Sequence, residues 1–149
     1  MQPATHIKRV LICEDEGITL MALRKALIRA RYVVVGEETD GEKVVALARQ
    51  LQPDLILMDI ELTGSLSGLG AIRAILQEKP LPIVVLTAYS DDAHRQAALE
   101  AGVCSYLVKS LTSEQLLPAL EEALIRFYTV DATTHAVVSQ TGSSVPETR

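Results

Sequence analysis

The chain contains the stretch LILMD at residues 55–59, in which four apolar residues run directly into an aspartate. An earlier stretch, VLICED at residues 10–15, has the same form and ends in two acidic residues. Short, unbroken apolar runs are typical of strands that are covered on both faces, as in a parallel sheet. The carboxyl ends of such strands lie at one edge of the sheet, where ligands bind near the point at which the strand order reverses. The sequence therefore predicts a cluster of negative charge at that edge, formed by Glu14, Asp15 and Asp59.

This cluster has the composition of a magnesium site. Carboxylates that lie close together raise one another's pKa unless a cation offsets their charge. An oxygen-only site that is open to solvent suits Mg²⁺, which keeps several of its waters. Taken alone, residues 14–16 could also be an acidic cluster favoured by a helix N-terminus, and Asp59 could cap a helix. The interpretation as a metal site depends on the strands bringing these residues together.

Length and composition fit one globular domain. The chain has 149 residues, of which 48% are hydrophobic, and a mean hydropathy of +0.23, which excludes a disordered chain. No apolar run reaches the roughly 18 residues that a membrane span needs. Residues 1–6 lack the apolar core of a signal peptide, so we expect a cytoplasmic protein without a membrane partner. The net charge of −5 argues against direct nucleic acid binding by this chain.

The cysteines and histidines form no recognisable site. Cys13 lies inside the first apolar run and Cys104 just before the last one, and no C-x-x-C motif is present. We expect both to be small buried hydrophobic residues. His6, His94 and His135 have no ligand spacing and are expected to lie in solvent.

Strand-like and helix-like segments alternate five times along the chain. The strands are expected at residues 9–13, 32–36, 54–58, 82–86 and 105–108. Between them, leucine, isoleucine and valine recur with the period of a helix. This alternation gives right-handed crossovers and an α/β fold, a parallel sheet with helices on both faces.

Two segments depart from the strong pattern. The fourth helix, about residues 91–101, has alanine at its apolar positions, so it should bury little area and be loosely held. Gly102 should end it, and a capping box at residues 112–115 should begin the fifth helix. The domain is expected to span residues 8–127, and the polar residues 128–149 are expected to form a flexible tail.

Three further residues lie at the ends of the later strands. Thr87 ends the fourth strand, Tyr106 lies in the fifth, and Lys109 follows it. A carboxylate nucleophile, a bound Mg²⁺, a hydroxyl and a lysine are the parts needed to accept a phosphoryl group, because this transfer depends mainly on positioning and charge stabilisation. Singly, Thr87 could cap a helix, Lys109 could be solvated, and Tyr106 could be a core residue with its hydroxyl at the surface.

Together these motifs resemble the receiver domain of two-component response regulators, the family that includes the chemotaxis regulators. The matching stretches are ICEDE (12–16), LMDI (57–60), VLTA (85–88) and YLVK (106–109), in the right order at four strand ends. The resemblance covers roughly residues 8–127. It implies a flavodoxin-like, doubly wound sheet of five parallel strands in the order 2-1-3-4-5, flanked by five helices.

The resemblance also implies a phosphoacceptor and a metal site. Asp59 would be phosphorylated by a histidine kinase or a phosphotransfer protein, in a Mg²⁺-dependent reaction. Asp15 and Asp59 would ligate Mg²⁺ directly and Glu14 through water, and the backbone carbonyl of Glu61 would be the remaining protein ligand. The chain would then act as a switch that changes its partners, with no enzyme activity beyond its own phosphorylation and dephosphorylation.

The same resemblance implies how the switch works. Thr87 and Lys109 would contact the phosphoryl oxygens, and Tyr106 would swing inward with Thr87 on activation. We expect the output on the surface of the fourth helix, the fifth strand and the fifth helix, which could also form a homodimer. No effector domain follows in this sequence, so the chain is expected to be a stand-alone receiver or part of a longer regulator.

Two features depart from the family pattern. Most receivers have proline after the lysine, whereas this chain has Ser110. The Lys109–Ser110 bond is therefore either a strained cis bond, which costs about 2.5–4 kcal/mol, or a trans bond with Lys109 reaching the site differently. The loop at residues 60–68 lacks the common proline, has Ser67 where aspartate is frequent, and is one residue longer than the commonest version.

Two other functions stay open. One is a Mg²⁺-dependent phosphohydrolase with an aspartyl-phosphate intermediate, but in the haloacid dehalogenase-like family the nucleophile ends the first strand and a cap domain recognises the substrate. Here Asp59 ends the third strand and no cap is present. The other is a degenerate receiver that signals without phosphate. The intact set of acidic residues, threonine and lysine argues against this alternative, while Ser110 is compatible with it.

Overall fold

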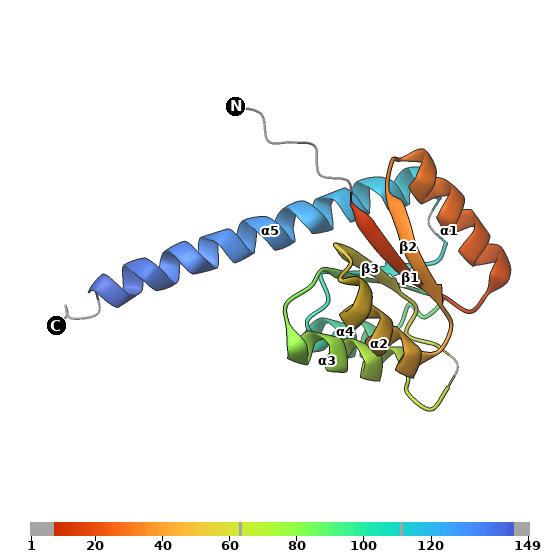
Figure 1. The fold of residues 1–149 in the computed structure, drawn as a ribbon, viewed down its shortest axis with the longest axis horizontal. Coiled ribbons are helices and arrows are strands. Elements are labelled where there is room, and N and C mark those ends of the chain that lie inside the picture. The colour runs from red at the N-terminus through yellow and green to blue at the C-terminus, as the bar shows by residue number, and fades with distance from the viewer. Residues whose placement is uncertain (1–7, 63, 111, 145–149) are drawn as a thin grey trace.

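The computed structural model describes residues 8–62, 64–110 and 112–144. Strands and helices alternate along these residues (Figure 1): β1 (Arg9–Cys13), α1 (Gly17–Arg29), β2 (Val33–Glu38), α2 (Gly41–Leu51), β3 (Leu55–Met58), α3 (Gly68–Glu78), β4 (Ile83–Thr87), α4 (Asp92–Ala101), β5 (Ser105–Val108) and α5 (Ser113–Ser144). The strands pair in parallel in the order β2-β1-β3-β4-β5. The predicted fold class and strand order are confirmed, and the strand boundaries differ from the predicted ones by two residues at most.

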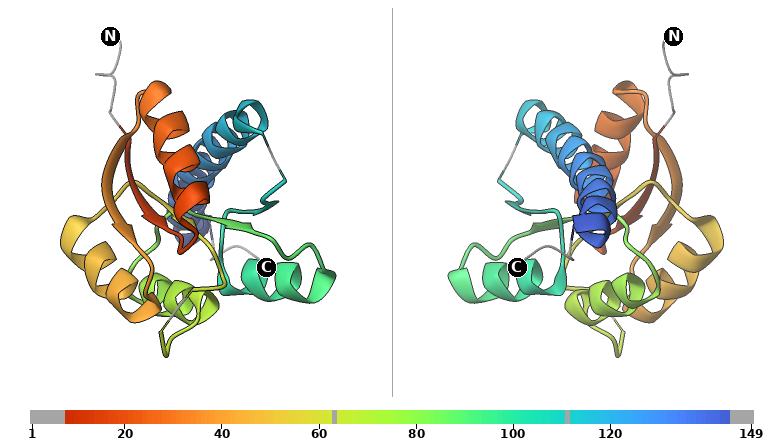
Figure 2. Two further views of the ribbon diagram at one scale, coloured as in Figure 1. Left: turned by 90° about the vertical axis from the view of Figure 1, so that its right-hand side faces the viewer. Right: turned by 90° about the vertical axis from the view of Figure 1, so that its left-hand side faces the viewer.

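Helices cover both faces of the sheet. Figure 2 shows α1 and α5 on one side and α2, α3 and α4 on the other. Successive residues of a strand point to opposite faces, and β1 shows the consequence. Val10 and Ile12 pack in the α1–α5 layer, whereas Leu11 and Cys13 pack in the layer of the other three helices. The apolar run in β1 is therefore unbroken because both of its faces are buried.

The helix ends follow the capping pattern of the sequence. Gly102 has a φ of +108° and ends α4, as predicted, because only glycine adopts this conformation without strain. At the start of α5, the N–H of Gln115 donates to Oγ1 of Thr112 at 3.3 Å, and the N–H of Thr112 donates to Oε1 of Gln115 at 2.9 Å. These reciprocal bonds confirm the predicted capping box.

The three helices on the second face are anchored very differently. The buried residues of α3 are Gly68, Ala71, Ile72 and Ile75. Among the residues of α4, all of which the structure describes, Ala98 alone is buried. The prediction that the fourth helix buries little area is therefore confirmed.

The last helix is longer than the sequence predicted. The structure continues α5 to Ser144, a helix of 32 residues, so the expected end of the helix near residue 127 is wrong. Figure 1 shows the helix extending far beyond the sheet. The apolar pattern marks only the part of a helix that packs, whereas each added residue of an existing helix gains its own backbone hydrogen bond. The flexibility of residues 128–144 stays a prediction, and residues 145–149 lie outside the described part of the chain.

Among the described helices, α5 included, none has an apolar stretch long enough to span a bilayer.

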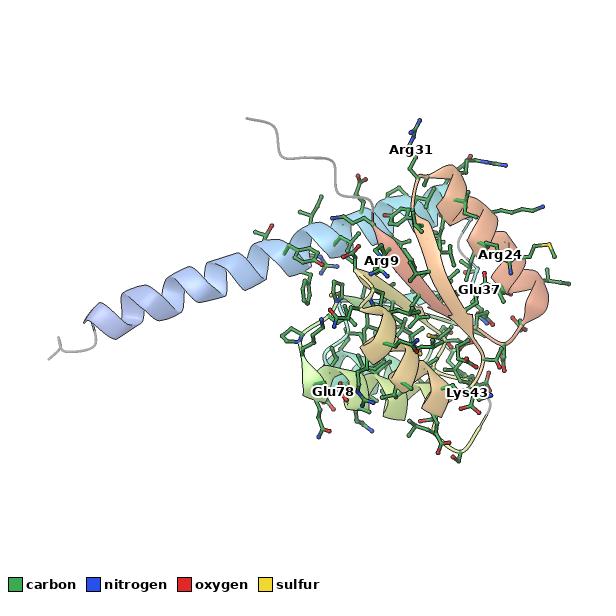
Figure 3. The ribbon with its side chains drawn as sticks, in the orientation of Figure 1. Arg9, Arg24, Arg31, Glu37, Lys43 and Glu78 are labelled. Atoms are coloured by element: carbon green, nitrogen blue, oxygen red, sulfur yellow. The ribbon has the colours of Figure 1, made fainter. Side chains whose placement is uncertain are left out.

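Ion pairs at the surface connect neighbouring elements. The guanidinium of Arg24 in α1 donates to both carboxylate oxygens of Glu37 in β2, at 2.5 and 2.8 Å, and Figure 3 labels both residues where the helix faces the edge strand. Arg49 and Glu78 form a similar pair between α2 and α3. Exposed pairs of this kind contribute at most about 1 kcal/mol each.

Candidate functional site

The acidic residues meet where β1 and β3 end. These strands are neighbours, with Cys13 opposite Met58, so the residues that follow them share one edge of the sheet. One carboxylate oxygen from each of Glu14, Asp15 and Asp59 lies within 4.8 Å of the others. Glu14 and Asp59 are buried, whereas Asp15 is exposed. The structure thus brings together the three predicted residues, two of them buried and one facing solvent.

The donor set of this cluster fits a hard divalent cation. All of its side-chain ligand atoms are carboxylate oxygens, which Mg²⁺ prefers, and the exposed side leaves room for the waters that Mg²⁺ retains. Burial raises the pKa of Glu14, and the nearby charge of Asp59 raises it further, although hydrogen bonds from the Glu16 N–H and from Lys109 oppose the shift. Such a carboxyl group is stabilised in its ionised form when positive charge is added beside it.

Lys109 supplies one positive charge to the cluster. Its Nζ lies 2.9 Å from Oδ2 of Asp59, 3.0 Å from Oε2 of Glu14 and 3.1 Å from Oε1 of Glu16. Burial by itself lowers the pKa of Lys109, but the hydrogen bonds to Asp59, Glu14 and Glu16 outweigh it and raise the pKa above its ordinary value. Lys109 is therefore charged, and it is the bridge between the two buried carboxylates.

The structure shows whether the peptide bond between Lys109 and Ser110 is cis or trans. No cis peptide bond occurs among the described residues, so the Lys109–Ser110 bond is trans. The backbone N–H of Lys109 donates to the carbonyl of Thr87 at 2.8 Å, which continues the pairing of β5 with β4. With the strand position held in this way, the side chain reaches Asp59 from a trans bond.

Glu16 is a member of the site to which the sequence assigned no role. Its side chain is 63% exposed and pairs with Lys109, and this hydrogen bond lowers the pKa of Glu16. The backbone N–H of Glu16 donates to Oε2 of Glu14 at 3.0 Å. The run of three acidic residues was the available signal, but it does not show which of them face the lysine.

Thr87 and Tyr106 lie on the neighbouring strands β4 and β5, and each bonds to the backbone of Tyr89 in the loop that leads into α4. Thr87 is fully buried at the end of β4, and its Oγ1 accepts the N–H of Tyr89 at 3.4 Å. Tyr106 is 4% exposed, and its hydroxyl donates to the carbonyl of Tyr89 at 2.8 Å. Burial raises the pKa of Tyr106. The tyrosine ring is therefore inside the protein in this structure.

The loop from β3 to α3 is held close to Asp59. The N–H of Glu61 donates to Oδ1 of Asp59 at 2.9 Å. A Cβ on Gly68 would lie 2.3 Å from the carbonyl oxygen of Asp59, so glycine is required there. Ser67 caps α3, because its Oγ accepts the N–H of Gly70 at 3.0 Å. The serine that departs from the family pattern therefore serves as a helix cap.

Two aromatic residues beside the site were not found from the sequence. Tyr89 donates its hydroxyl hydrogen bond to Glu61, and its ring stacks on His94. The prediction that His94 lies in solvent is only partly right, because its side chain is 44% exposed but pairs with Asp91 at 2.7 Å. No periodicity or motif marks these contacts. His6 lies outside the described residues, as does the side chain of residue 135.

A groove opens on the other side of Lys109, between α1 and the start of α5. It has a volume of about 230 Å³, and its lining includes Ile18, Ala22, Lys109 and Leu116. Ile18 is 87% exposed. An apolar surface therefore lies next to the lysine of the acidic cluster.

Residues 10–121 match the family model of the response regulator receiver domain. The transcriptional regulatory protein PdtaR of Mycobacterium tuberculosis is 40% identical over 125 residues, which are 84% of this chain and 60% of PdtaR. The chemotaxis protein CheY of Thermotoga maritima is 33% identical over 116 residues, 77% of this chain and 96% of that protein. This chain therefore spans nearly all of one relative and less than two thirds of the other.

Solved structures agree with this match. The signal receiver domain of a modulated diguanylate cyclase from Desulfovibrio desulfuricans superposes with a TM-score of 0.77 at 31% identity, covering 83% of this chain and 98% of that one. The response regulator domain of Thermotoga maritima CheB superposes with a TM-score of 0.73 at 27% identity, covering 80% and 97% of the two chains.

Proposed function

The chain belongs to the response regulator receiver domain family, and on this premise we propose that it accepts a phosphoryl group on Asp59 and changes its binding partners as a result. One observation carries the proposal. The buried carboxylate of Asp59 is held 2.9 Å from the Lys109 ammonium, within 4.8 Å of ligand oxygens from Glu14 and Asp15. This arrangement supplies a nucleophile together with the charges that a phosphoryl group needs around it.

The acidic cluster would hold Mg²⁺ through Asp15 and Asp59 directly and through Glu14 by way of water, with the backbone carbonyl of Glu61 as a further ligand. When bound, Mg²⁺ supplies positive charge that offsets the phosphoryl oxygens. The exposure of Asp15 and the lack of nitrogen or sulfur ligands in the cluster support this choice of metal over zinc or copper.

Asp59, Lys109 and Thr87 would have separate roles in the phosphoryl transfer. One oxygen of Asp59 attacks the phosphorus, and the bond from phosphorus to the donor group breaks, so that an acyl phosphate forms. Lys109, which neutralises Asp59 before transfer, would pair with a phosphoryl oxygen afterwards. Thr87 has a buried hydroxyl whose oxygen accepts a long hydrogen bond, 3.4 Å, from the N–H of Tyr89. Its own proton would be available to donate to another phosphoryl oxygen.

A histidine kinase or a phosphotransfer protein is the proposed donor. The exposed apolar residue Ile18 and the groove beside Lys109 support a protein donor that docks next to Asp59. Given a kinase selected for its ability to label the wild type, Ile18→Ser should slow transfer from that kinase and leave labelling by acetyl phosphate unchanged. Ile28→Ser is the matched control, because Ile28 is also exposed but lies near the other end of α1. Equal slowing by both variants would contradict this docking site.

The proposed output surface is that of α4, β5 and α5, which is also a candidate homodimer surface. It contains Leu99, which is 43% exposed, on the weakly buried α4. We propose a cytoplasmic switch with no substrate of its own and no direct contact with nucleic acid through this domain, in keeping with the net charge of −5.

Labelling with a small phosphodonor tests the central assignment. Incubation with acetyl phosphate and Mg²⁺ should add one phosphoryl group to the intact mass, and Asp59→Asn or removal of Mg²⁺ should abolish the addition. Glu122→Gln, a change to an exposed acid of α5 outside the cluster, should label as the wild type does. Equal labelling of Asp59→Asn would overturn the acceptor, and a wild type that never labels would favour a degenerate receiver. Many turnovers of a phosphate ester would favour the phosphohydrolase.

A further inference from the structure

Tyr89 contacts four different residues in and around the site. It lies two residues after Thr87, in the connection from β4 to α4. Its backbone N–H, its carbonyl, its hydroxyl and the face of its ring each have a different partner. The backbone contacts are to Thr87 and Tyr106, whereas the side-chain contacts reach across the site.

The hydroxyl of Tyr89 holds the loop that follows Asp59. It donates to the carboxylate of Glu61, and this hydrogen bond raises the pKa of Tyr89. The backbone N–H of Glu61 in turn donates to Oδ1 of Asp59 at 2.9 Å. Glu61 is thus fixed at both its backbone and its side chain, and its side chain is turned toward Tyr89.

The ring of Tyr89 holds the first turn of α4. It stacks on His94 with ring centroids 4.3 Å apart and an angle of 2° between the planes. His94 is itself fixed by Asp91, which lies 2.7 Å from its Nδ1 and accepts its backbone N–H at 3.1 Å. Because Ala98 is the one buried residue of α4, this stack is a substantial part of what positions the helix.

We propose that Tyr89 is a positioning residue that couples the loop carrying Glu61 to the first turn of α4. The inference rests on the proposed function, in which the carbonyl of Glu61 faces Mg²⁺. If Glu61 shifts on metal binding, either the Tyr89 ring moves with it or the hydrogen bond between the two side chains breaks. Either change alters the surroundings of the His94 ring, which stacks on Tyr89. Coupling of this kind is reciprocal, so loosening α4 should also weaken metal binding.

A metal-free experiment tests the link by itself. Tyr89→Phe removes the hydroxyl and keeps a ring that can stack on His94. Amide exchange at residues 94 and 95, whose N–H groups donate to Asp91, should become about threefold to tenfold faster in this variant, the effect of losing a hydrogen bond of roughly 0.7–1.4 kcal/mol. Glu61→Ala should have the same effect, and the double variant should add little to either single change. Tyr32→Phe removes a hydroxyl elsewhere in the fold and is the control. Unchanged exchange in Tyr89→Phe, or exchange that rises equally in Tyr32→Phe, would overturn the link.

A spectroscopic experiment tests the coupling to metal. The imidazole resonances of His94 should shift when Mg²⁺ is added to the wild type and to Tyr32→Phe, and this shift should be lost in Tyr89→Phe even at saturating Mg²⁺. A shift of equal size in Tyr89→Phe would overturn the coupling. A wild type that binds no Mg²⁺ would count against the proposed metal site, and the metal-free exchange would then still decide the link between Glu61 and α4.

Discussion

The helices α3 and α4 have nearly the same length and lie on the same face of the sheet, yet they are held in different ways. A site residue lies at the end of the strand before each helix: Asp59 directly follows β3, and Thr87 is the last residue of β4. α3 buries four residues, two of them isoleucines, whereas α4 buries one alanine. The helix behind the proposed phosphoacceptor is therefore anchored in the core, and the helix behind the threonine is not.

This difference suggests that the part of the site at Asp59 stays fixed and that the part at Thr87 and α4 can move. Asp59 directly follows β3, a strand whose residues are all buried and pack into the core on both faces of the sheet, so it can keep its position when charge arrives. α4 depends on exposed polar and aromatic contacts at its first turn, and elements held in that way belong to the low-stability end of a protein. We therefore propose that a small movement of Thr87 shifts the population of α4 positions without unfolding the domain.

The largest effect is expected from shortening one apolar side chain in each of the two helices. Ile72→Ala in α3 removes a fully buried side chain and should lower the free energy of unfolding by about 2–5 kcal/mol. Leu99→Ala in α4 removes a side chain that is 43% exposed and should change it by about 0.5 kcal/mol or less. Urea denaturation followed by circular dichroism measures both. Equal losses would show that α4 is anchored as firmly as α3.

The second prediction concerns the acceptor side of the site. Mg²⁺ at a hundredfold excess over its dissociation constant should raise the free energy of unfolding by about 2.7 kcal/mol. At the same metal concentration Asp15→Asn should lose most of this gain, and more of it than Glu14→Gln, because Asp15 is the proposed direct ligand. Glu122→Gln, which changes an exposed acid of α5, is the control for removing an acid. The same gain in Asp15→Asn as in the wild type would place the metal elsewhere.

A smaller effect should appear in the pH dependence of the metal-free protein. Burial raises the pKa of Glu14 in the fold, so the contribution of this group to stability is present below its unfolded pKa of about 4.3 and is lost as pH rises through the higher folded value. Glu14→Gln cannot ionise. Its stability relative to the wild type should therefore increase from pH 4 to pH 7, as measured by urea denaturation in EDTA. A difference that is flat or falls with pH would contradict the raised pKa.

The alternation of strands and helices and the acidic cluster could be predicted because their signals are local, whereas the strand order was implied by the resemblance to receiver domains. Unbroken apolar runs mark buried strands, and a residue that follows such a strand must lie at the edge of the sheet, which placed Glu14, Asp15 and Asp59 together. The same reasoning predicted the weak burial of α4 from its alanines and the end of that helix from Gly102.

Other features depend on contacts that no sequence pattern records. The stack of Tyr89 on His94 joins a loop to a helix through side-chain orientation, and the pairing of Glu16 with Lys109 depends on where one long side chain comes to rest. The length of α5 was missed because a helix that leaves the core no longer needs an apolar stripe. The trans Lys109–Ser110 bond could not be chosen from the sequence, since both isomers were compatible with a lysine at the strand end.

Hydrogen exchange with and without beryllofluoride and Mg²⁺ tests most directly the claim that the site has one fixed half and one adjustable half. In the free protein, the amides of α3 should exchange more slowly than those of α4. On addition of the phosphoryl mimic, protection should change most across residues 88–101 and 105–109, and α1 and α3 should change little. A response confined to the loop at residues 60–68, or equal responses in α3 and α4, would contradict the account.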